Sequence, residues 1–533
     1  MKRSLALLLA LVMAVAMLAG CGGNNTPDNS TPGNNTQQGN ADPSGNGGGT
    51  GAPEQLDRVR IGISSWPNTL DPAVEMGKKC TRIITQIYDT LLYCENDGTI
   101  SSYICDSWKN VDEVTTEYKL KSGITFHNGD PLTAADVKYS FERVLLDESG
   151  YTDPNVATVV GTISSVDAVD DLTVRIVTDG PDPIIFSRIA SMLGVYIVPQ
   201  NYLESVGTDV FATQPMGTGP YKVDSITPES LMLSYYEGYY GAAPVAKQIE
   251  YRYIAEEAVL ATSLMTGEID LAPDISTSTA LMLQGQSNIQ VVNKPYSASN
   301  MIRISSKEGL MSDKKLRQAL SLAIDRQLLV DTLWDGYASI PNGYNYSEFG
   351  EYYIEDYPEY EYNPEKAAQL VAESSYNGET ITIQNIPGYY AMAEEAMEAV
   401  IDMWKDVGIN AQINSVEAIK TSTIEHVATW SNGLRFSDPL GGVWALWGEG
   451  TGVQKDLWNA PARFNELGKL MQSETDVNAR RELYREMMQI WDDEVPGLIL
   501  YCPDAIYAIR DGLSWNYEPG RAVNFRAEGL TIT

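Results

Sequence analysis

The sequence predicts a layered fold of the α/β class, and three observations support this, although the same mixture of elements also allows an α+β arrangement. Short runs of β-branched residues alternate with longer stretches in which apolar residues recur every three or four positions. Apolar residues make up 43% of the 533 residues, which is ordinary for a chain with packed cores. No internal repeat of fixed period is present, so a solenoid or propeller is not expected. At about 100–200 residues per domain, the length predicts two to four domains.

Two strands and one helix are the clearest local elements. Residues 59–63 and 172–177 alternate inward and outward side chains, as half-buried strands do. Residues 134–146 have their apolar side chains on one helical face. Thr133 precedes this pattern and Asp136 follows three positions later, in the order of a capping box. We therefore expect a helix that begins at residue 134.

Further helices are expected in the second half of the chain. Each has an apolar stripe at helical spacing, and they are predicted at residues 316–334, 391–407 and 480–492.

The first 20 residues predict a secretory signal peptide. The apolar run over residues 5–18 is shorter than the roughly 20 residues that a membrane-spanning helix needs. The quartet Leu-Ala-Gly-Cys that ends at Cys21 resembles a bacterial lipobox, which implies cleavage before Cys21 and lipid attachment to its sulfur. Residues 21–55 are rich in small and polar side chains and are expected to form a disordered linker. The protein is thus predicted to be lipid-anchored on the outer face of the cytoplasmic membrane, on the extracellular or periplasmic side.

Composition excludes some classes of function. With 37 Lys and Arg against 71 Asp and Glu, the net charge is −34, so a nucleic-acid partner is not expected. The same excess hints at cationic or amine-bearing solutes. Only two histidines, His127 and His426, are available for metal binding or imidazole catalysis, and we expect neither a metal site nor a cofactor. His127 lies in a predicted turn and is expected to be a hydrogen-bonded structural residue.

Four cysteines follow Cys21 in the sequence. They permit two disulfides in three connectivities, and a pair at Cys94 and Cys105 is one candidate because an Asn-Asp-Gly turn lies between them. Four buried free thiols are an equal alternative. The sequence leaves the state of these four residues open: Cys80, Cys94, Cys105 and Cys502.

A series of strings along the chain resembles one protein family. Together they resemble the family 5 extracellular solute-binding proteins, the dipeptide- and oligopeptide-binding components of ABC importers. The likeness extends from about residue 58 to residue 515. The strings that carry it lie at residues 66–72, 87–91, 105–108, 119–140, 215–221, 264–270, 316–326, 362–367 and 496–500.

The resemblance implies a two-lobed, periplasmic-binding-protein-like fold with an extra inserted domain, of type II and cluster C-like. The ligand is then expected between domains I and III, enclosed by hinge closure. The implied boundaries are residues 56–86, 215–297 and 500–533 for domain I, residues 87–214 for domain II, and residues 298–499 for domain III.

The resemblance also suggests where a ligand binds. In the peptide binders of this family an aspartate in the third domain accepts the α-ammonium of the ligand, and residues 433–440 resemble the stretch that carries it. Asp438 is therefore the first candidate, with an Asp-Pro turn as the alternative role. Arg435 in the same stretch is a second candidate. Aromatic rings that can stack on a ligand give three more ligand-binding candidates: Trp66, Trp444 and Trp447.

The function that these observations predict is capture of an extracellular peptide or similar small solute and its delivery to an ABC permease, by a monomer without catalytic activity. One alternative is a receptor of the same fold for an oligosaccharide, an opine, a metal chelate or haem. Another is a secreted hydrolase, although no G-x-S-x-G, H-E-x-x-H or P-loop motif is present. A third is an adhesion or signalling lipoprotein, which would bind a protein partner and no small ligand.

Overall fold

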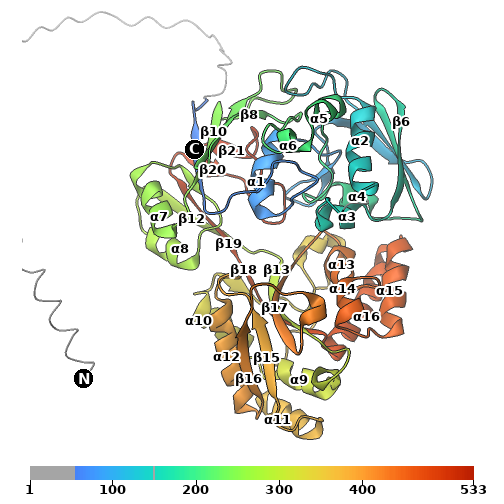
Figure 1. Ribbon diagram of the computed structural model, residues 1–533, viewed down its shortest axis with the longest axis vertical. Coiled ribbons are helices and arrows are strands. Elements are labelled where there is room, and N and C mark those ends of the chain that lie inside the picture. Colours follow the sequence, from blue (N-terminus) through green and yellow to red (C-terminus); the bar gives the residue numbers. More distant parts are fainter. Residues whose placement is uncertain (1–54, 148–149) are drawn as a thin grey trace, which may run out of the picture. The chain divides into compact units, whose positions relative to one another are not determined.

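The computed structural model describes residues 55–147 and 150–533 (Figure 1). The chain divides after residue 52 into two units, and everything below concerns the second, residues 53–533. The predicted signal peptide, the lipidated Cys21 and the linker up to residue 54 lie outside the described residues. In the part of the chain that the structure describes, no helix combines the length and apolar character needed to cross a membrane.

Strand β1 (Val59–Ile63) lies inside a seven-stranded sheet, as its alternating pattern predicts. Val59 and Ile61 are fully buried, and β1 pairs in parallel with its neighbours on both sides. Three stretches that are distant in the sequence therefore build one sheet. Its order is β12 (Ile289–Lys294), β19 (Ala505–Arg510), β11 (Leu271–Ala272), β1, β10 (Gln248–Tyr253), β9 (Ser230–Tyr235) and β8 (Tyr221–Ile226).

A four-stranded antiparallel sheet follows in the chain order β4 (Cys105–Asn110), β5 (Thr115–Leu120), β6 (Ile163–Asp170) and β7 (Thr173–Thr178), with β7 between β5 and β6. The predicted helix is α2 (Ala134–Leu145), and its capping box is present: the Thr133 backbone N–H donates to Asp136 Oδ2 (3.0 Å). One continuous hydrophobic core joins this sheet to the seven-stranded sheet. The other elements of this half are α1 (Lys78–Ile87), α3 (Pro154–Val160), α4 (Ile185–Ile189), α5 (Gln200–Val206), α6 (Thr208–Phe211), α7 (Glu257–Thr266), α8 (Thr277–Leu283), β2 (Tyr93–Cys94), β3 (Ile100–Ser101), β20 (Leu513–Trp515) and β21 (Leu530–Ile532).

A six-stranded mixed sheet organises the remaining residues. Its order is β14 (Ala338–Ser339), β18 (Gly497–Pro503), β13 (Ala298–Ile304), β17 (Val427–Gly433), β15 (Thr380–Asn385) and β16 (Asn410–Ser415). The helices around it are α9 (Lys314–Leu322), α10 (Arg326–Leu333), α11 (Pro364–Glu373), α12 (Ala393–Asp406), α13 (Ala445–Trp447), α14 (Gly452–Asp456), α15 (Ala462–Ser473) and α16 (Val477–Glu494), with short helices η1 (Leu310–Ser312), η2 (Ser347–Tyr352), η3 (Thr421–Thr423) and η4 (Leu440–Trp444).

The single helix predicted over residues 316–334 is wrong, because two helices occupy this stretch. Helix α9 ends at Leu322 and α10 begins at Arg326. The Asp325 side chain caps the second helix by accepting a hydrogen bond from the Leu328 backbone N–H (2.9 Å). Apolar spacing continues through the break, so periodicity alone does not show a cap in its middle.

Two lobes follow from the sheets. We call residues 55–294 and 505–533 the large lobe and residues 298–503 the small lobe. Within the described residues the chain passes between them at residues 295–297, from β12 to β13, and at Asp504, from β18 to β19 (Figure 1). The boundary proposed between residues 499 and 500 falls inside β18, all of which belongs to the small-lobe sheet.

The four cysteines of the described residues are free thiols. Cys94 lies in β2 and Cys105 in β4, and no disulfide joins them. Burial raises the pKa of the Cys105 thiol to about 12, so it stays protonated and poorly nucleophilic at neutral pH. The structure thus favours the free-thiol alternative over the disulfide pairing.

His127 is a structural residue, as its place in a turn predicts. Its Nε2 donates to the Gly219 carbonyl oxygen (3.0 Å), and its Nδ1 accepts a longer bond from the Gly217 backbone N–H (3.4 Å). Both ring nitrogens are therefore used by the neutral imidazole. Burial is the main cause that lowers the pKa of His127 from 6.5 to about 4.

We expect this histidine to make stability depend on pH. Between pH 6.5 and 4 the unfolded chain takes up a proton that folded His127 does not, so stability is lost as pH falls through this range. At about 1.36 kcal/mol per pH unit, the loss is up to roughly 3 kcal/mol. Urea unfolding of the wild type and of His127→Gln at pH 4.5 and pH 7 should show a smaller pH effect in the variant. An equal pH effect in both proteins would contradict this assignment.

Candidate functional site

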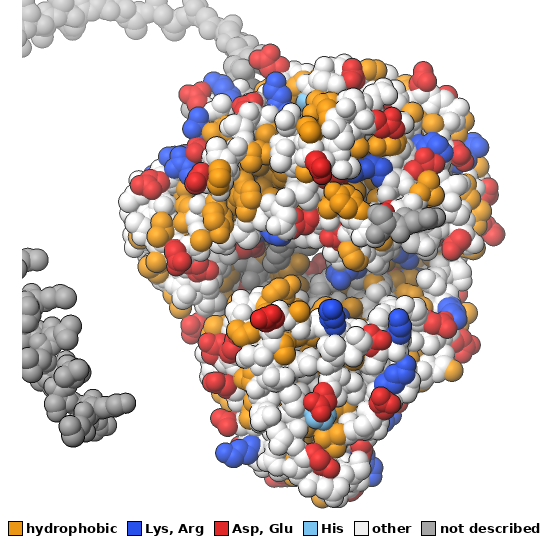
Figure 2. Space-filling view, in the orientation of Figure 1, with side chains coloured by type: hydrophobic (Ala, Val, Ile, Leu, Met, Phe, Trp, Pro, Cys, Tyr) orange, Lys and Arg blue, Asp and Glu red, His pale blue; other side chains and the backbone are white. Residues whose placement is uncertain are grey.

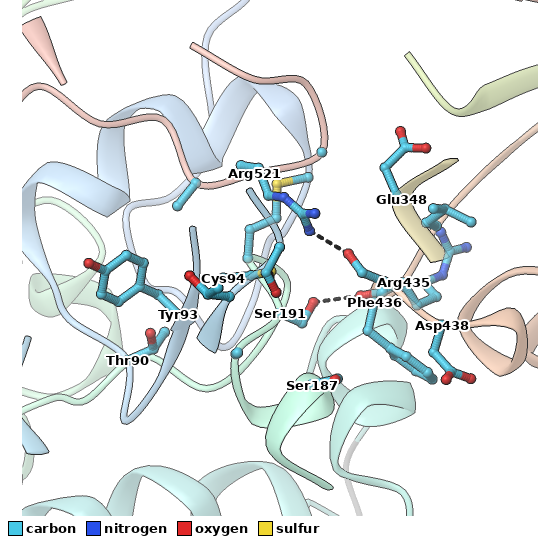
Figure 3. Close-up of a pocket in the computed structure, with 18 of the residues that line it drawn as sticks. Thr90, Tyr93, Cys94, Ser187, Ser191, Glu348, Arg435, Phe436, Asp438 and Arg521 are labelled. Atoms are coloured by element: carbon cyan, nitrogen blue, oxygen red, sulfur yellow. Dashed lines mark hydrogen bonds between the residues drawn. The ribbon is translucent and has the colours of Figure 1, made fainter. Parts of the chain in front are cut away.

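A cavity of about 440 Å³ lies between the two lobes (Figures 2 and 3). Its size is within the range of about 300–1,000 Å³ that is usual for sites of small ligands. Its lining residues come from the stretches 85–103, 183–196 and 520–526 of the large lobe, from 348–352 and 434–438 of the small lobe, and from Tyr296 and Ser297 between the lobes. The surface view shows the molecule hollowed between the lobes. A molecule in this cavity would contact both lobes at once.

The lobes touch each other along the loop that follows β17. The Ser191 hydroxyl of the large lobe donates to the Arg435 carbonyl oxygen (2.5 Å), and the Arg521 guanidinium donates to the Ser437 hydroxyl (Figure 3). The Arg188 guanidinium lies 4.6 Å from the centre of the Phe436 ring. Residues 434–438 are therefore fixed by contacts from the large lobe as well as by their own strand.

Asp438 lines the cavity, but its carboxylate is bound within the protein. Arg480 donates two hydrogen bonds to it, from Nη1 to Oδ2 (2.6 Å) and from Nη2 to Oδ1 (2.8 Å), and the Leu440 backbone N–H also donates to Oδ1 (2.9 Å). Asp438 is 1% exposed and Arg480 is fully buried. The pair neutralises the charge that a ligand ammonium needs, and the bond from Leu440 is that of an Asp-Pro turn. The geometry supports the turn role over contact with a ligand amine.

Arg435 also lines the cavity, and its charge has no such partner. Its Nη1 donates to the Gly433 carbonyl oxygen (3.3 Å), and no carboxylate oxygen of the described residues lies within 4.0 Å of it. Burial is the main cause that lowers the pKa of Arg435. This predicted residue is thus a partly buried cation at the cavity wall.

The three predicted tryptophans do not line the cavity. Trp447 is fully buried in the small-lobe core, where its Nε1 donates to the Tyr344 hydroxyl (2.8 Å). Trp444 covers Gly468, where a Cβ would lie 2.0 Å from the indole. Trp66 packs against Tyr253 with ring centres 6.4 Å apart. In this structure each of these indoles packs against other protein groups.

Two polar groups of the cavity are not found by the sequence reasoning. Arg521 is 8% exposed, and its Nε has no hydrogen-bond partner among the residues that the structure describes. Arg526 is 5% exposed and pairs through Nη2 with Asp89 Oδ1 (2.6 Å). Both come from the C-terminal stretch, more than 400 residues from Asp89, and no local motif marks them. Only the fold brings them to the cavity.

An aromatic wall completes the large-lobe side. Tyr93 and Tyr103 are stacked in parallel, with ring centres 4.1 Å apart and an angle of 1° between the planes. The Arg526 guanidinium lies 4.0 Å from the centre of the Tyr103 ring. Both tyrosines line the cavity, so they provide aromatic surface beside the charged groups.

Comparison with known proteins places the chain in a family. The model described as "Bacterial extracellular solute-binding proteins, family 5 Middle" matches residues 99–453, more than half of the chain. The chain belongs to this family. Its members are the solute-binding components of ABC importers, and this chain is such a substrate-binding protein.

Individual relatives agree with this membership. The glutathione-binding protein GsiB of Pectobacterium atrosepticum is 26% identical to this family 5 protein over 459 residues, which cover 81% of this chain and 86% of the relative. The structure of DppA from Helicobacter pylori, in complex with the peptide STSA, matches with a TM-score of 0.78 and 20% identity over 89% of this chain and 98% of the other. The structure of AgaA from A. tumefaciens R10, in complex with agropinic acid, matches with a TM-score of 0.77 and 21% identity over 89% and 99%. The fold is therefore the two-lobed type II fold of periplasmic binding proteins, as predicted.

Proposed function

We propose that this family 5 protein encloses a small solute, a peptide or a related amino-acid derivative, in the cavity between its lobes and presents it to an ABC permease. The observation that carries the proposal is the cavity of about 440 Å³ whose walls come from both lobes. A ligand that contacts both lobes favours the closed arrangement by its differential affinity, and that arrangement is what the permease distinguishes.

The relatives support this class of solute. GsiB is named for glutathione, DppA was solved with a peptide and AgaA with agropinic acid. These ligands are small molecules of peptide or amino-acid character, and a cavity of this volume suits molecules of that size.

The proposal includes no chemical change of the solute. Neither histidine is among the residues that line the cavity, and the buried Ser191 hydroxyl there donates to a carbonyl oxygen rather than to a base. The cavity carboxylates of Asp89 and Asp438 are each paired with an arginine. We therefore propose binding and release without turnover.

We also propose the place in which the protein works. Lipid attached to Cys21 would hold it on the outer face of the cytoplasmic membrane as a monomer, close to the permease. Replacing Cys21 with Ser should abolish the incorporation of labelled fatty acid into the protein by the producing cells. Equal labelling of the variant and the wild type would count against the anchor.

Ligand-dependent stabilisation tests the binding function. A solute bound only by the folded state, at 100 times its Kd, should raise the free energy of unfolding by about 2.7 kcal/mol. Thermal unfolding with a panel of di- to pentapeptides, glutathione and opine-type acids measures this, and mass spectrometry of the mixtures checks that each compound is unchanged. A compound that raises the melting temperature and is recovered intact supports the proposal. A cleaved or altered compound would instead indicate an enzyme.

A further inference from the structure

Three arginines line the cavity, and they differ in how their charge is balanced. Arg526 is paired with Asp89, in the way that buried cations in proteins usually are. Arg435 and Arg521 have no carboxylate oxygen within 4.0 Å among the described residues. Leaving a buried charge unpaired costs free energy, so we expect a negatively charged group from outside the chain to balance these two arginines.

Arg521 is the more deeply buried of the two. It is 8% exposed, and its Nη1 donates to the neutral Ser437 hydroxyl. Within the described part of the chain its Nε has no hydrogen-bond partner. A planar guanidinium offers several donors in a fixed arrangement, and here they are only partly used. The unused donor belongs to a side chain that lines the cavity.

Arg435 faces the same cavity from the small lobe. Its guanidinium makes one long hydrogen bond, to the Gly433 carbonyl oxygen (3.3 Å), and burial lowers its pKa. Figure 3 shows Arg435 on the small-lobe loop, with Arg521 extending toward that loop from the C-terminal segment. The loop holds Arg435 two residues from Ser437, the partner of Arg521.

Among the described residues, the acidic side chains that line the cavity form no ion pair with Arg435 or Arg521. Asp89 forms an ion pair with Arg526, and Asp438 forms one with Arg480. Asp97 is exposed and is bonded to Thr99. The two remaining acids, Glu348 and Glu351, form no ion pair with either arginine. Arg435 and Arg521 are therefore cations of the cavity wall without an ion-pair partner among the described residues, although the five carboxylates that line the cavity outnumber its three arginines.

We infer that Arg435 and Arg521 bind a carboxylate of the solute, one from each lobe, so that the preferred solutes are acids. The inference rests on the proposed function. A carboxylate matches the guanidinium geometry and would use the free donors of both side chains, and its charge would draw the two lobes together. The cavity would then prefer anionic solutes, whereas the net charge of the whole chain hints at cationic ones.

The test compares acids with their amides in four proteins. We would purify four proteins without refolding: the wild type, Arg435→Gln, Arg521→Gln and the control Arg58→Gln. Arg58 is exposed and lies outside the cavity, so its replacement should not affect binding. Native mass spectrometry identifies any co-purified solute. Calorimetric titration then measures its affinity and those of trialanine, glutathione and agropinic acid, each beside the derivative with its carboxylates amidated.

The expected result is that acids bind the wild type and Arg58→Gln on the order of 10- to 100-fold more tightly than their amides do, and that each cavity variant loses a similar factor for the acid. Ligand-free Arg521→Gln should keep or raise the melting temperature, because it removes an unpaired buried charge. An arginine with only a structural role would lower the melting temperature and leave the preference for acids unchanged.

Other results separate this inference from the proposed function. If acids and amides bind equally, or if the bound solute is neutral or cationic, the carboxylate inference is overturned and the solute-binding function stands. If no solute co-purifies and no compound of the panel binds any of the four proteins, the proposed function is overturned as well.

Discussion

Replacing Asp438 with Asn is expected to lower the free energy of unfolding by about 3–5 kcal/mol, the usual cost of removing one partner of a buried ion pair. The variant leaves the Arg480 guanidinium fully buried, with its two charged hydrogen bonds replaced by weaker ones. The opposing role, in which Asp438 accepts a ligand ammonium, predicts a loss of affinity with little loss of stability.

Denaturant unfolding together with hydrogen exchange measures this effect where it arises. Exchange should increase in α16 and in the loop around residue 438, because the pair joins these two segments of the small lobe. Glu486→Gln is the matched control, since this carboxylate also pairs with an arginine but on the exposed surface, and it should change stability little. A stable Asp438→Asn protein that no longer binds solute would contradict the structural role.

Replacing Asp89 with Asn should have an effect of similar size, about 3–5 kcal/mol, but in the large lobe. Asp89 is buried and accepts hydrogen bonds from Arg526 (2.6 Å) and from the hydroxyls of Thr218 (2.7 Å) and Tyr240 (2.9 Å). Arg526 belongs to the C-terminal stretch that forms one wall of the cavity, so the variant should loosen that wall as well as reduce stability.

The readout for this variant is hydrogen exchange over residues 513–533, combined with denaturant unfolding. Faster exchange in that stretch, with α16 unchanged, is the expected pattern. Asp97→Asn is the control, because Asp97 lines the same cavity but is exposed and bonded only to nearby Thr99. If Asp89→Asn leaves the exchange of residues 513–533 unaltered, the ion pair of Asp89 with Arg526 is not what holds the C-terminal stretch in place.

Local elements of the fold follow from the sequence because their causes are local. Thr133 and Asp136 cap α2 from within one helical turn, and the strand at residues 59–63 needs only its alternating pattern and a buried sheet position. The break at Asp325 shows the limit of that reasoning. An N-cap inside a continuous apolar pattern is found from the hydrogen bond and not from the period.

The candidate site is harder to predict, because its groups are brought together by the fold. Asp438 and Arg480 are 42 residues apart, and Arg521 and Ser437 are 84 apart. A sequence segment can predict that residues 433–440 belong to a site, and residues 434–438 do line the cavity, but it does not show whether a carboxylate there is already paired. The tryptophans illustrate the same limit, since an indole that suits a ligand also suits a core, and Trp447 lies in a core.

A crystal structure of the protein, purified without refolding and saturated with the solute it binds, is the most direct test of the whole account. The predicted result is one solute molecule in the cavity, unaltered, in contact with Arg521 of the large lobe and with the loop at residues 434–438 of the small lobe. A solute bound on the outer surface of a single lobe, with the cavity left empty, would contradict it.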